Sequence, residues 1–200
     1  MGARTGQSHD KHDWQQADYA EAWVAKNQQR TKRRSPLLAR MMAEAPHPAD
    51  AALRVLDVGG GYGFISAAVL KAFPRAQVTL QDFSEPMIEQ ARVYLAPQAA
   101  QMQFELSDLR DPTWSVGLGP FDLVVSAIAI HNLRDLAAMA SCYAAIRSLL
   151  VPGGWFLDCD HLDKAGGGDL HIDMLRQAGF KNVRALVGDD EHTPILKAQA

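Results

Sequence analysis

The sequence has few cysteines, no long apolar run and no large excess of charge. Its two cysteines, Cys142 and Cys159, are too few for a disulfide framework and lack the paired spacing of a zinc site, so we expect a reducing, cytoplasmic environment. No stretch is long and apolar enough to span a bilayer, and the polar start of the chain lacks the apolar centre of a signal peptide. These absences predict a soluble protein with no membrane partner.

Charge gives equally little reason to expect a polyanionic partner. The 20 Lys and Arg residues and 23 Asp and Glu residues give a formal charge of −3, so we expect no nucleic-acid partner. The composition does not indicate an oligomeric state. One basic run, from Lys26 to Arg40, contains no acid. It is either a solvated helix face or a site for an anionic substrate or RNA.

Strands and helices alternate along most of the chain. We expect a disordered polar tail at 1–13 and a helical segment to about residue 50, with one helix before Pro36 and a second beginning there. From residue 51 on, apolar strands separated by helices indicate a parallel sheet covered on both faces. The expected strands are 54–58, 77–81, 102–106, 121–126, 155–159, 182–187 and 195–198, and the expected helices are 62–73, 86–95, 136–149 and 170–178.

The last two strands break this alternation, because the stretch between them is too short for a crossover helix and predicts a hairpin. We therefore expect an α/β fold of the Rossmann-like, doubly wound type. Its seven-stranded sheet would be mostly parallel with an antiparallel C-terminal pair, in a three-layer α/β/α arrangement. A helical lid at 14–50 would precede a ligand-binding domain at 51–200.

The stretch VLDVGGGYG, at 55–63, is the end of the first strand followed by a loop with four glycines in five residues. In an open α/β sheet, ligands sit beyond the carboxyl ends of the strands, near the point where strand order reverses. Glycines let the backbone approach a ligand, and the next helix offers free N–H groups to an anion. The dinucleotide-binding pattern G-x-G-x-x-G fits poorly, since its last place falls on Phe64 when counted from Gly59 and on Ser66 when counted from Gly61.

The spacing Asp57-x-Gly59-x-Gly61-x-Gly63 instead resembles the first motif of class I S-adenosylmethionine-dependent methyltransferases. Later segments resemble the same family in order, over most of the chain from residue 53: VTLQDFSEPMIEQAR, FELSDLRD, FDLVVSAIAIHNL, LLVPGGWFL and LRQAGFKNV. The resemblance implies a methyltransferase that binds S-adenosyl-L-methionine and releases S-adenosyl-L-homocysteine.

The resemblance also assigns cofactor contacts to individual residues. A carboxylate ending the second strand, Asp82, can accept hydrogen bonds from both ribose hydroxyls, or it could cap the next helix, as Ser84 could instead. Asp108 would accept from the adenine amino group or would form a turn. Asp57 would orient the glycine loop or receive the methionyl ammonium. The full set of expected cofactor contacts is Asp57, Gly59, Gly61, Gly63, Asp82, Phe83, Asp108, Leu109 and Ser126.

Methyl transfer from a sulfonium requires an aligned acceptor, exclusion of water and, for some acceptors, removal of a proton. The fourth strand ends in Ser-Ala-Ile-Ala at 126–129. Enzymes that methylate exocyclic amino or amide nitrogens often carry Asn/Asp-Pro-Pro-Tyr/Phe there, which argues against that subclass. His131 follows. It is either a general base, given an ordinary histidine pKa of about 6.5, or a residue with a packing or cofactor-side role.

Two further segments are candidates for contact with the acceptor. The acidic stretch 158–173 offers Asp158 and His161; we expect no metal there, because magnesium-dependent relatives carry acids at the end of the fourth strand. At the other end of the chain, Trp14, Tyr19 and Trp23 either form a lid over the cofactor or only dock the helix that carries them.

Three functions remain as hypotheses. The leading one is methyl transfer by in-line displacement to a small-molecule acceptor. The alternatives are an RNA or protein methyltransferase and a non-catalytic protein that binds the cofactor or its product.

Overall fold

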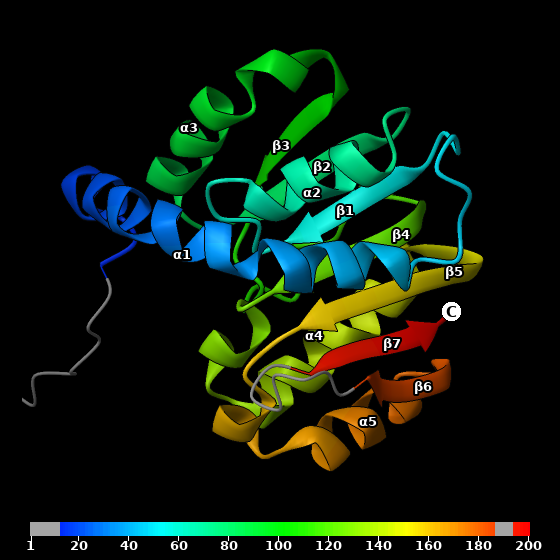
Figure 1. Cartoon of the computed structure of the whole chain (residues 1–200). Helices are drawn as coiled ribbons and strands as arrows, with labels where there is room; N and C mark the ends of the chain where they lie inside the picture. The colour runs from blue at the N-terminus through cyan, green and yellow to red at the C-terminus, as the bar shows by residue number, and fades with distance from the viewer. Residues whose placement is uncertain (1–12, 187–193) are drawn as a thin grey trace, which may run out of the picture.

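The computed structural model describes residues 13–186 and 194–200, except for the side chains of 28–34. A seven-stranded sheet lies between two layers of helices (Figure 1). The strands are Arg54–Val58 (β1), Gln77–Asp82 (β2), Met102–Leu106 (β3), Phe121–Ala127 (β4), Leu150–Cys159 (β5), Lys181–Leu186 (β6) and Ile195–Gln199 (β7). The helices are Ala17–Ala43 (α1), Phe64–Ala72 (α2), Glu85–Tyr94 (α3), Leu136–Leu149 (α4) and Gly168–Gln177 (α5).

The strand order is β3-β2-β1-β4-β5-β7-β6, with parallel pairing from β3 through β5 and antiparallel pairing of β7 with both β5 and β6. The expected doubly wound sheet and its antiparallel C-terminal pair are therefore confirmed. The order reverses between β1 and β4. The loops that follow these two strands consequently lie side by side, where this architecture binds its ligands.

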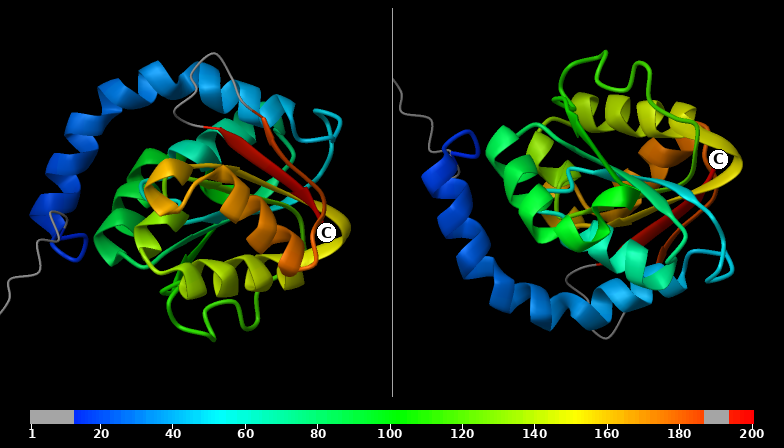
Figure 2. Two further views of the ribbon diagram at one scale, coloured as in Figure 1. Left: turned by 90° about the horizontal axis from the view of Figure 1, so that it is seen from below. Right: turned by 90° about the horizontal axis from the view of Figure 1, so that it is seen from above.

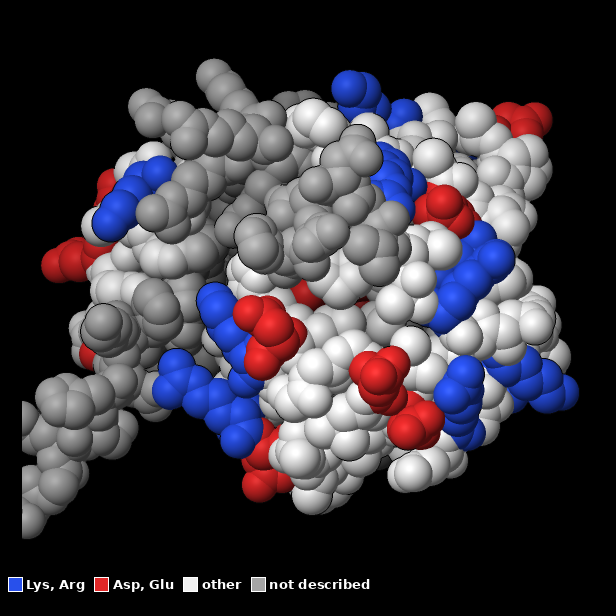
Figure 3. All heavy atoms as spheres, turned by 60° about the horizontal axis from the view of Figure 1, so that its bottom comes forward, with Lys and Arg blue, Asp and Glu red and all other residues white. Residues whose placement is uncertain are grey.

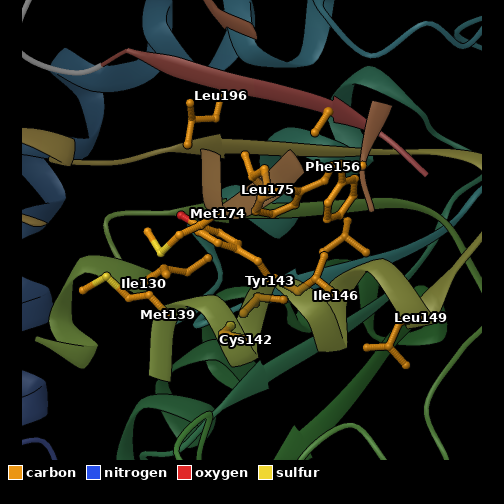
Figure 4. Close-up of a cluster of buried hydrophobic side chains, with 14 of the residues drawn as sticks. Ile130, Met139, Cys142, Tyr143, Ile146, Leu149, Phe156, Met174, Leu175 and Leu196 are labelled. Carbon is orange, nitrogen blue, oxygen red and sulfur yellow. The ribbon is translucent and has the colours of Figure 1, made fainter. Parts of the chain in front are cut away.

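Side chains alternate along the central strands β1, β4 and β5 and along β7 between two apolar clusters, one on each face of the sheet. On β1, Val55 packs with Met41 of α1 in the cluster under α1 and α2, whereas Leu56 packs in the cluster under α4 and α5. Figure 4 shows this second cluster, in which Tyr143 of α4 lies between Ile130 and Phe156. The three-layer arrangement follows directly from this alternation.

Helix α1 runs through Pro36, so the prediction of two separate helices was wrong. A proline inside a helix removes one backbone hydrogen bond, yet α1 is held at both ends. Val24 packs near Tyr62, and Leu38 packs against α2. Near the end of α1, Lys197 Nζ donates to the carbonyl (2.6 Å) and the carboxylate (3.2 Å) of Glu44. The helix arches around one side of the body (Figure 2).

Local capping explains where two of the helices begin. Ser84 Oγ accepts from Met87 N (3.2 Å) at the start of α3, so Ser84 rather than Asp82 is the cap. Asp135 Oδ1 accepts from Ala138 N (2.8 Å) at the start of α4. Three 3₁₀ helices were not predicted, because segments of four to six residues are too short to show apolar periodicity. They are Ala96–Gln101 (η1), Ile130–Leu133 (η2) and Leu162–Ala165 (η3).

Some expectations concern residues outside the described ranges. These are the polar tail, apart from Asp13, the last residue of the expected strand 182–187, and nearly all of the connection between β6 and β7. Within the described ranges, no helix has the length and apolar character needed to cross a membrane.

Candidate active site

The glycine loop after β1 is held in place by the end of β2. Gly59 N donates to Gln81 Oε1 (3.0 Å), Gly60 N to Gln81 O (2.9 Å) and Gly61 N to Asp82 Oδ2 (2.9 Å). Gln81 in turn donates from Nε2 to Ser107 O (2.6 Å), which links the loop to the end of β3. Sequence reasoning did not single out Gln81, because a glutamine inside an apolar strand carries no motif.

The glycines of this loop have two different steric roles. A Cβ on Gly59 would lie 2.5 Å from Ala129 Cβ, and one on Gly60 would lie 2.5 Å from Leu80 Cγ, so packing leaves no room at either position. A Cβ on Gly61 would meet nothing within 4 Å, and this residue has a φ of +54°. The backbone at Gly61 therefore faces open space, as a loop that cradles a ligand must.

Asp82 is 7% exposed and has acceptor capacity left. Its Oδ1 accepts from Ser84 N (2.9 Å) and its Oδ2 accepts from Gly61 N (2.9 Å). Burial raises the pKa of this carboxyl, and the hydrogen bonds from Ser84 and Gly61 oppose the rise. A carboxylate has roughly four lone-pair positions, so the backbone donors of Ser84, Gly61 and Phe83 leave acceptor capacity for a diol. These donors and acceptors fit the ribose of an adenosyl group.

Asp57 is fully buried, and one of its oxygens lacks a partner. Oδ2 accepts from Ser66 Oγ (2.7 Å), while Oδ1 has no hydrogen-bond partner among the described residues. Burial raises the pKa of Asp57 to about 7, and the bond from Ser66 opposes the rise. Gln81 and Asp82 orient the loop backbone, and the expected contact of Asp57 with a methionyl ammonium stays a prediction. An unpaired buried oxygen suits a cationic donor such as an ammonium group.

Other expected cofactor residues occupy positions with clear local functions. Asp108 Oδ1 accepts from Arg110 N (2.9 Å), which closes the turn after β3, and adenine binding by Asp108 stays a prediction. Leu109 packs against the cluster under α4 and α5. Ser126 is fully buried, and its Oγ donates to Val58 O (3.1 Å), so it joins β4 to β1.

The segment before α1 lies on the loop after β2. Ser84 Oγ donates to the carbonyl of Trp14, and Gln15 Nε2 donates to the carbonyl of Phe83 (3.0 Å). Phe83 itself is 37% exposed. The chain that enters α1 is thereby tied to the two residues that follow Asp82.

Aromatic rings extend this contact to the glycine loop. The Trp14 ring lies 5.5 Å from that of Tyr19 and 5.2 Å from that of Trp23, and Trp23 lies 6.1 Å from Tyr62, which is inside the glycine loop. The three expected lid residues are thus brought together beside the loop. They also pack α1 against the body, whereas closure over the cofactor stays a prediction.

A histidine and an aspartate meet across the ends of β4 and β5. His131 Nδ1 lies 2.5 Å from Asp160 Oδ1, and His131 N donates to Asp160 Oδ2 (2.9 Å). The His131 side chain is 13% exposed and that of Asp160 is 1% exposed. If Nδ1 carries the hydrogen that faces the carboxylate, Nε2 is the nitrogen that can accept a proton.

Asp160 had no assigned role in the sequence analysis. The available signal was an acid directly after a strand that pairs in parallel with β4, which puts the ends of both strands at one edge of the sheet. His161 lies beside this pair: its N donates to Asp160 Oδ1 (2.8 Å), and its ring is 5.5 Å from the His131 ring.

Asp158 and its surroundings are buried under α4. Asp158 is fully buried, neither carboxyl oxygen has a hydrogen-bond partner among the described residues, and burial together with nearby Asp160 raises its pKa well above the usual range. The expected contact with substrate therefore does not suit Asp158. His171 is also buried, with Nδ1 2.7 Å from Tyr143 Oη and Nε2 3.0 Å from Ala165 O, so part of the stretch 158–173 belongs to the interior.

The surface charges are mixed in sign. On the face shown in Figure 3, basic and acidic side chains are interspersed. Of the basic run in α1, the side chains from 28 to 34 lie outside the described residues, which leaves Lys26 and Arg40. No group of three or more His, Cys, Asp or Glu side chains with the geometry of a metal site occurs within 13–186 and 194–200.

Comparison with protein families identifies one match over half of the chain: a family model described as a methyltransferase domain matches residues 55–154. A ribosomal RNA small subunit methyltransferase C from Haemophilus influenzae is 33% identical over 119 residues, which cover 60% of this chain and 31% of that protein. A malonyl-[acyl-carrier protein] O-methyltransferase from Magnetococcus marinus is 35% identical over 83 residues, which cover 42% of this chain and 30% of that protein. The matches thus span about a third of the length of these curated relatives.

A solved structure shares the fold over nearly the whole chain. An O-methyltransferase family protein from Burkholderia thailandensis superposes with a TM-score of 0.75 and 17% sequence identity, and the match covers 96% of this chain and 60% of that one. At this identity the likeness concerns the fold alone, which includes α1 as well as the sheet.

Proposed function

The chain belongs to the class I S-adenosylmethionine-dependent methyltransferases, and we propose that it transfers a methyl group by in-line displacement to a small-molecule acceptor whose proton is removed by His131. The observation that carries the finer part of this proposal is the contact between His131 and the buried carboxylate of Asp160. A histidine held in this way is equipped to act as a base.

The cofactor would lie against the glycine loop. When bound, it supplies an activated methyl group on a sulfonium. Asp82 would accept hydrogen bonds from the ribose hydroxyls, the free Oδ1 of Asp57 would face the methionyl ammonium, and Gly61 would allow close approach of the backbone. Phe83, Asp108 and Leu109 would border the adenine.

His131 would remove the acceptor proton on the opposite side of the site. Its Nε2 takes the proton while Asp160 accepts the hydrogen on Nδ1, so the imidazolium that forms lies against a carboxylate with 1% exposure. Holding the ring in one orientation places the base before the acceptor arrives. The ring group of Trp14, Tyr19 and Trp23 would exclude water from the cofactor side.

Several features favour a small acceptor over RNA or protein. The chain carries a net charge of −3, and the fourth strand ends in Ser-Ala-Ile-Ala rather than in the motif for exocyclic nitrogens. The names of the relatives differ in acceptor: one is a ribosomal RNA methyltransferase, one a malonyl-[acyl-carrier protein] O-methyltransferase and one a polyketide methyltransferase. The acceptor class must therefore be tested directly.

The test is release of S-adenosylhomocysteine when the protein and S-adenosylmethionine are incubated with fractionated cell extract. The proposal expects product with the low-molecular-weight filtrate, and unchanged product after nuclease or protease treatment of the extract. Product that disappears after nuclease treatment would identify an RNA acceptor, and product that disappears after protease treatment a protein acceptor. Cofactor binding without any product would identify a non-catalytic binder.

A further inference from the structure

The backbone is strained at the point where β4 ends. Ile128 has a φ of +56°, in the left-handed region, which a β-branched residue adopts only under constraint. Among the described residues, the other non-glycine residues with positive φ are Arg134 and Asn182. Ile128 and Arg134 stand on either side of η2, the short helix that carries His131.

Packing on both faces of the sheet holds this conformation. Side chains of consecutive strand residues normally point to opposite faces. Ala127 and Ile128, however, both pack in the cluster under α1 and α2, whereas Ile130, which is fully buried, packs in the cluster under α4 and α5. The left-handed turn therefore lets two successive side chains pack in the cluster under α1 and α2. The chain then crosses the end of the sheet to the cluster under α4 and α5.

Hydrogen bonds hold the same segment to β5. Ile128 N donates to Cys159 O (3.1 Å), and Asn132 Nδ2 donates to Ile128 O (3.2 Å). Three residues after Ile128, His131 N donates to Asp160 Oδ2. The position of the His131 ring thus depends on a crossover that begins at Ile128.

We propose that Ile128 is a positioning residue: its anchored, left-handed backbone sets where η2 crosses the end of the sheet and so holds His131 against Asp160. The proposal rests on the proposed function, in which His131 is the base. Strain at a functional site persists only where the surroundings over-determine it, and the two anchors with their hydrogen bonds supply that constraint.

The test compares three variants by hydrogen exchange of the His131 amide, by kcat and by the Kd for S-adenosylhomocysteine. Ile128→Gly removes both the strain and the anchor, Ile128→Val keeps a β-branched anchor, and Asn182→Gly relieves a left-handed residue on β6, which lies at the far edge of the sheet. We expect Ile128→Gly to exchange the His131 amide about tenfold faster and to lower kcat about tenfold, with Kd unchanged. Ile128→Val and Asn182→Gly should match the wild type at this amide.

An unchanged exchange rate in Ile128→Gly would overturn the proposal, as would equal acceleration in Asn182→Gly. If Ile128→Gly does not fold, Ile128→Asn serves in its place, because asparagine tolerates the left-handed region without the apolar anchor. The exchange result is independent of catalysis. Full turnover by His131→Ala would refute the base and leave the exchange result to decide the role of Ile128.

Discussion

The cofactor side and the acceptor side of the site are built in different ways. At the ends of β1 and β2, carboxyl and amide side chains hold the N–H groups of a loop made almost entirely of glycine. At the ends of β4 and β5, a histidine and an aspartate from different strands meet, and a strained isoleucine precedes them. The first arrangement is a backbone cradle suited to one constant ligand. The second consists of side chains, which can be exchanged as the acceptor changes.

The largest expected effect is on the acceptor side. Replacing the base in His131→Ala, or its partner in Asp160→Asn, should lower kcat by on the order of 1000-fold, since general base catalysis contributes roughly 100-fold to 10,000-fold. The Kd for S-adenosylhomocysteine should stay unchanged, because neither residue belongs to the cradle. Steady-state kinetics and calorimetry on the same preparations measure both quantities.

His47→Ala is the matched control for these variants, because His47 packs against Phe73 before β1, away from the site. It should keep full activity. Wild-type turnover by His131→Ala would show that the acceptor side needs no base. It would contradict the view that side chains at the ends of β4 and β5 act on the acceptor.

On the cofactor side, the next largest effect should be that of Asp57→Asn on the free energy of unfolding. The pKa of Asp57 is raised to about 7 in the fold, so the unfolded chain releases this proton at lower pH than the folded chain does. The protonated Asp57 carboxyl therefore contributes fully to the free energy of unfolding below about pH 4, and this contribution is lost as pH rises through about 7. Asp57→Asn should raise the free energy of unfolding at pH 8 by on the order of 3 kcal/mol and change it little at pH 3.5.

Urea unfolding of the wild type and Asp57→Asn at the two pH values measures this difference. The same variant should bind S-adenosylhomocysteine more weakly, because it lacks the charged oxygen that would face the ammonium. Parallel stability curves across this pH range would mean that Asp57 is already ionised in the fold.

Asp82→Ala should weaken binding of S-adenosylhomocysteine by about 100-fold, since two charge-assisted hydrogen bonds to the ribose are lost. This substitution should raise Kd, whereas the substitutions on the acceptor side should lower kcat. Asp163→Ala, at an exposed position of η3, is the matched control and should bind normally. Equal affinity of Asp82→Ala and the wild type for S-adenosylhomocysteine would show that Asp82 does not bind the ribose.

The smallest expected effect is that of salt on the acceptor. With a small acceptor, KM should change less than about twofold between 50 and 200 mM salt, because few counterions are released. RNA bound along the basic run of α1 would instead lose affinity by on the order of 1000-fold over this range. A steep dependence of KM on salt would therefore indicate that the acceptor is a polyanion such as RNA.

The comparison also explains what could be predicted from the sequence. The strand and helix pattern and the glycine loop with Asp57 could be predicted because the spacing of a few residues around one turn encodes them. Asp82 could be proposed because it ends the next strand, although it contacts Gly61 from 21 positions along the chain. The partnership of His131 with Asp160 joins residues 29 positions apart, and the left-handed backbone of Ile128 depends on packing against two layers. The continuous α1 was missed because tertiary anchors at both ends offset the local effect of Pro36.

Titration calorimetry of the wild-type protein with S-adenosylhomocysteine tests the central claim most directly, because it probes the cradle without any knowledge of the acceptor. The account predicts saturable binding of one ligand per chain, which also raises the melting temperature. Absence of binding at millimolar ligand by a folded sample would contradict it.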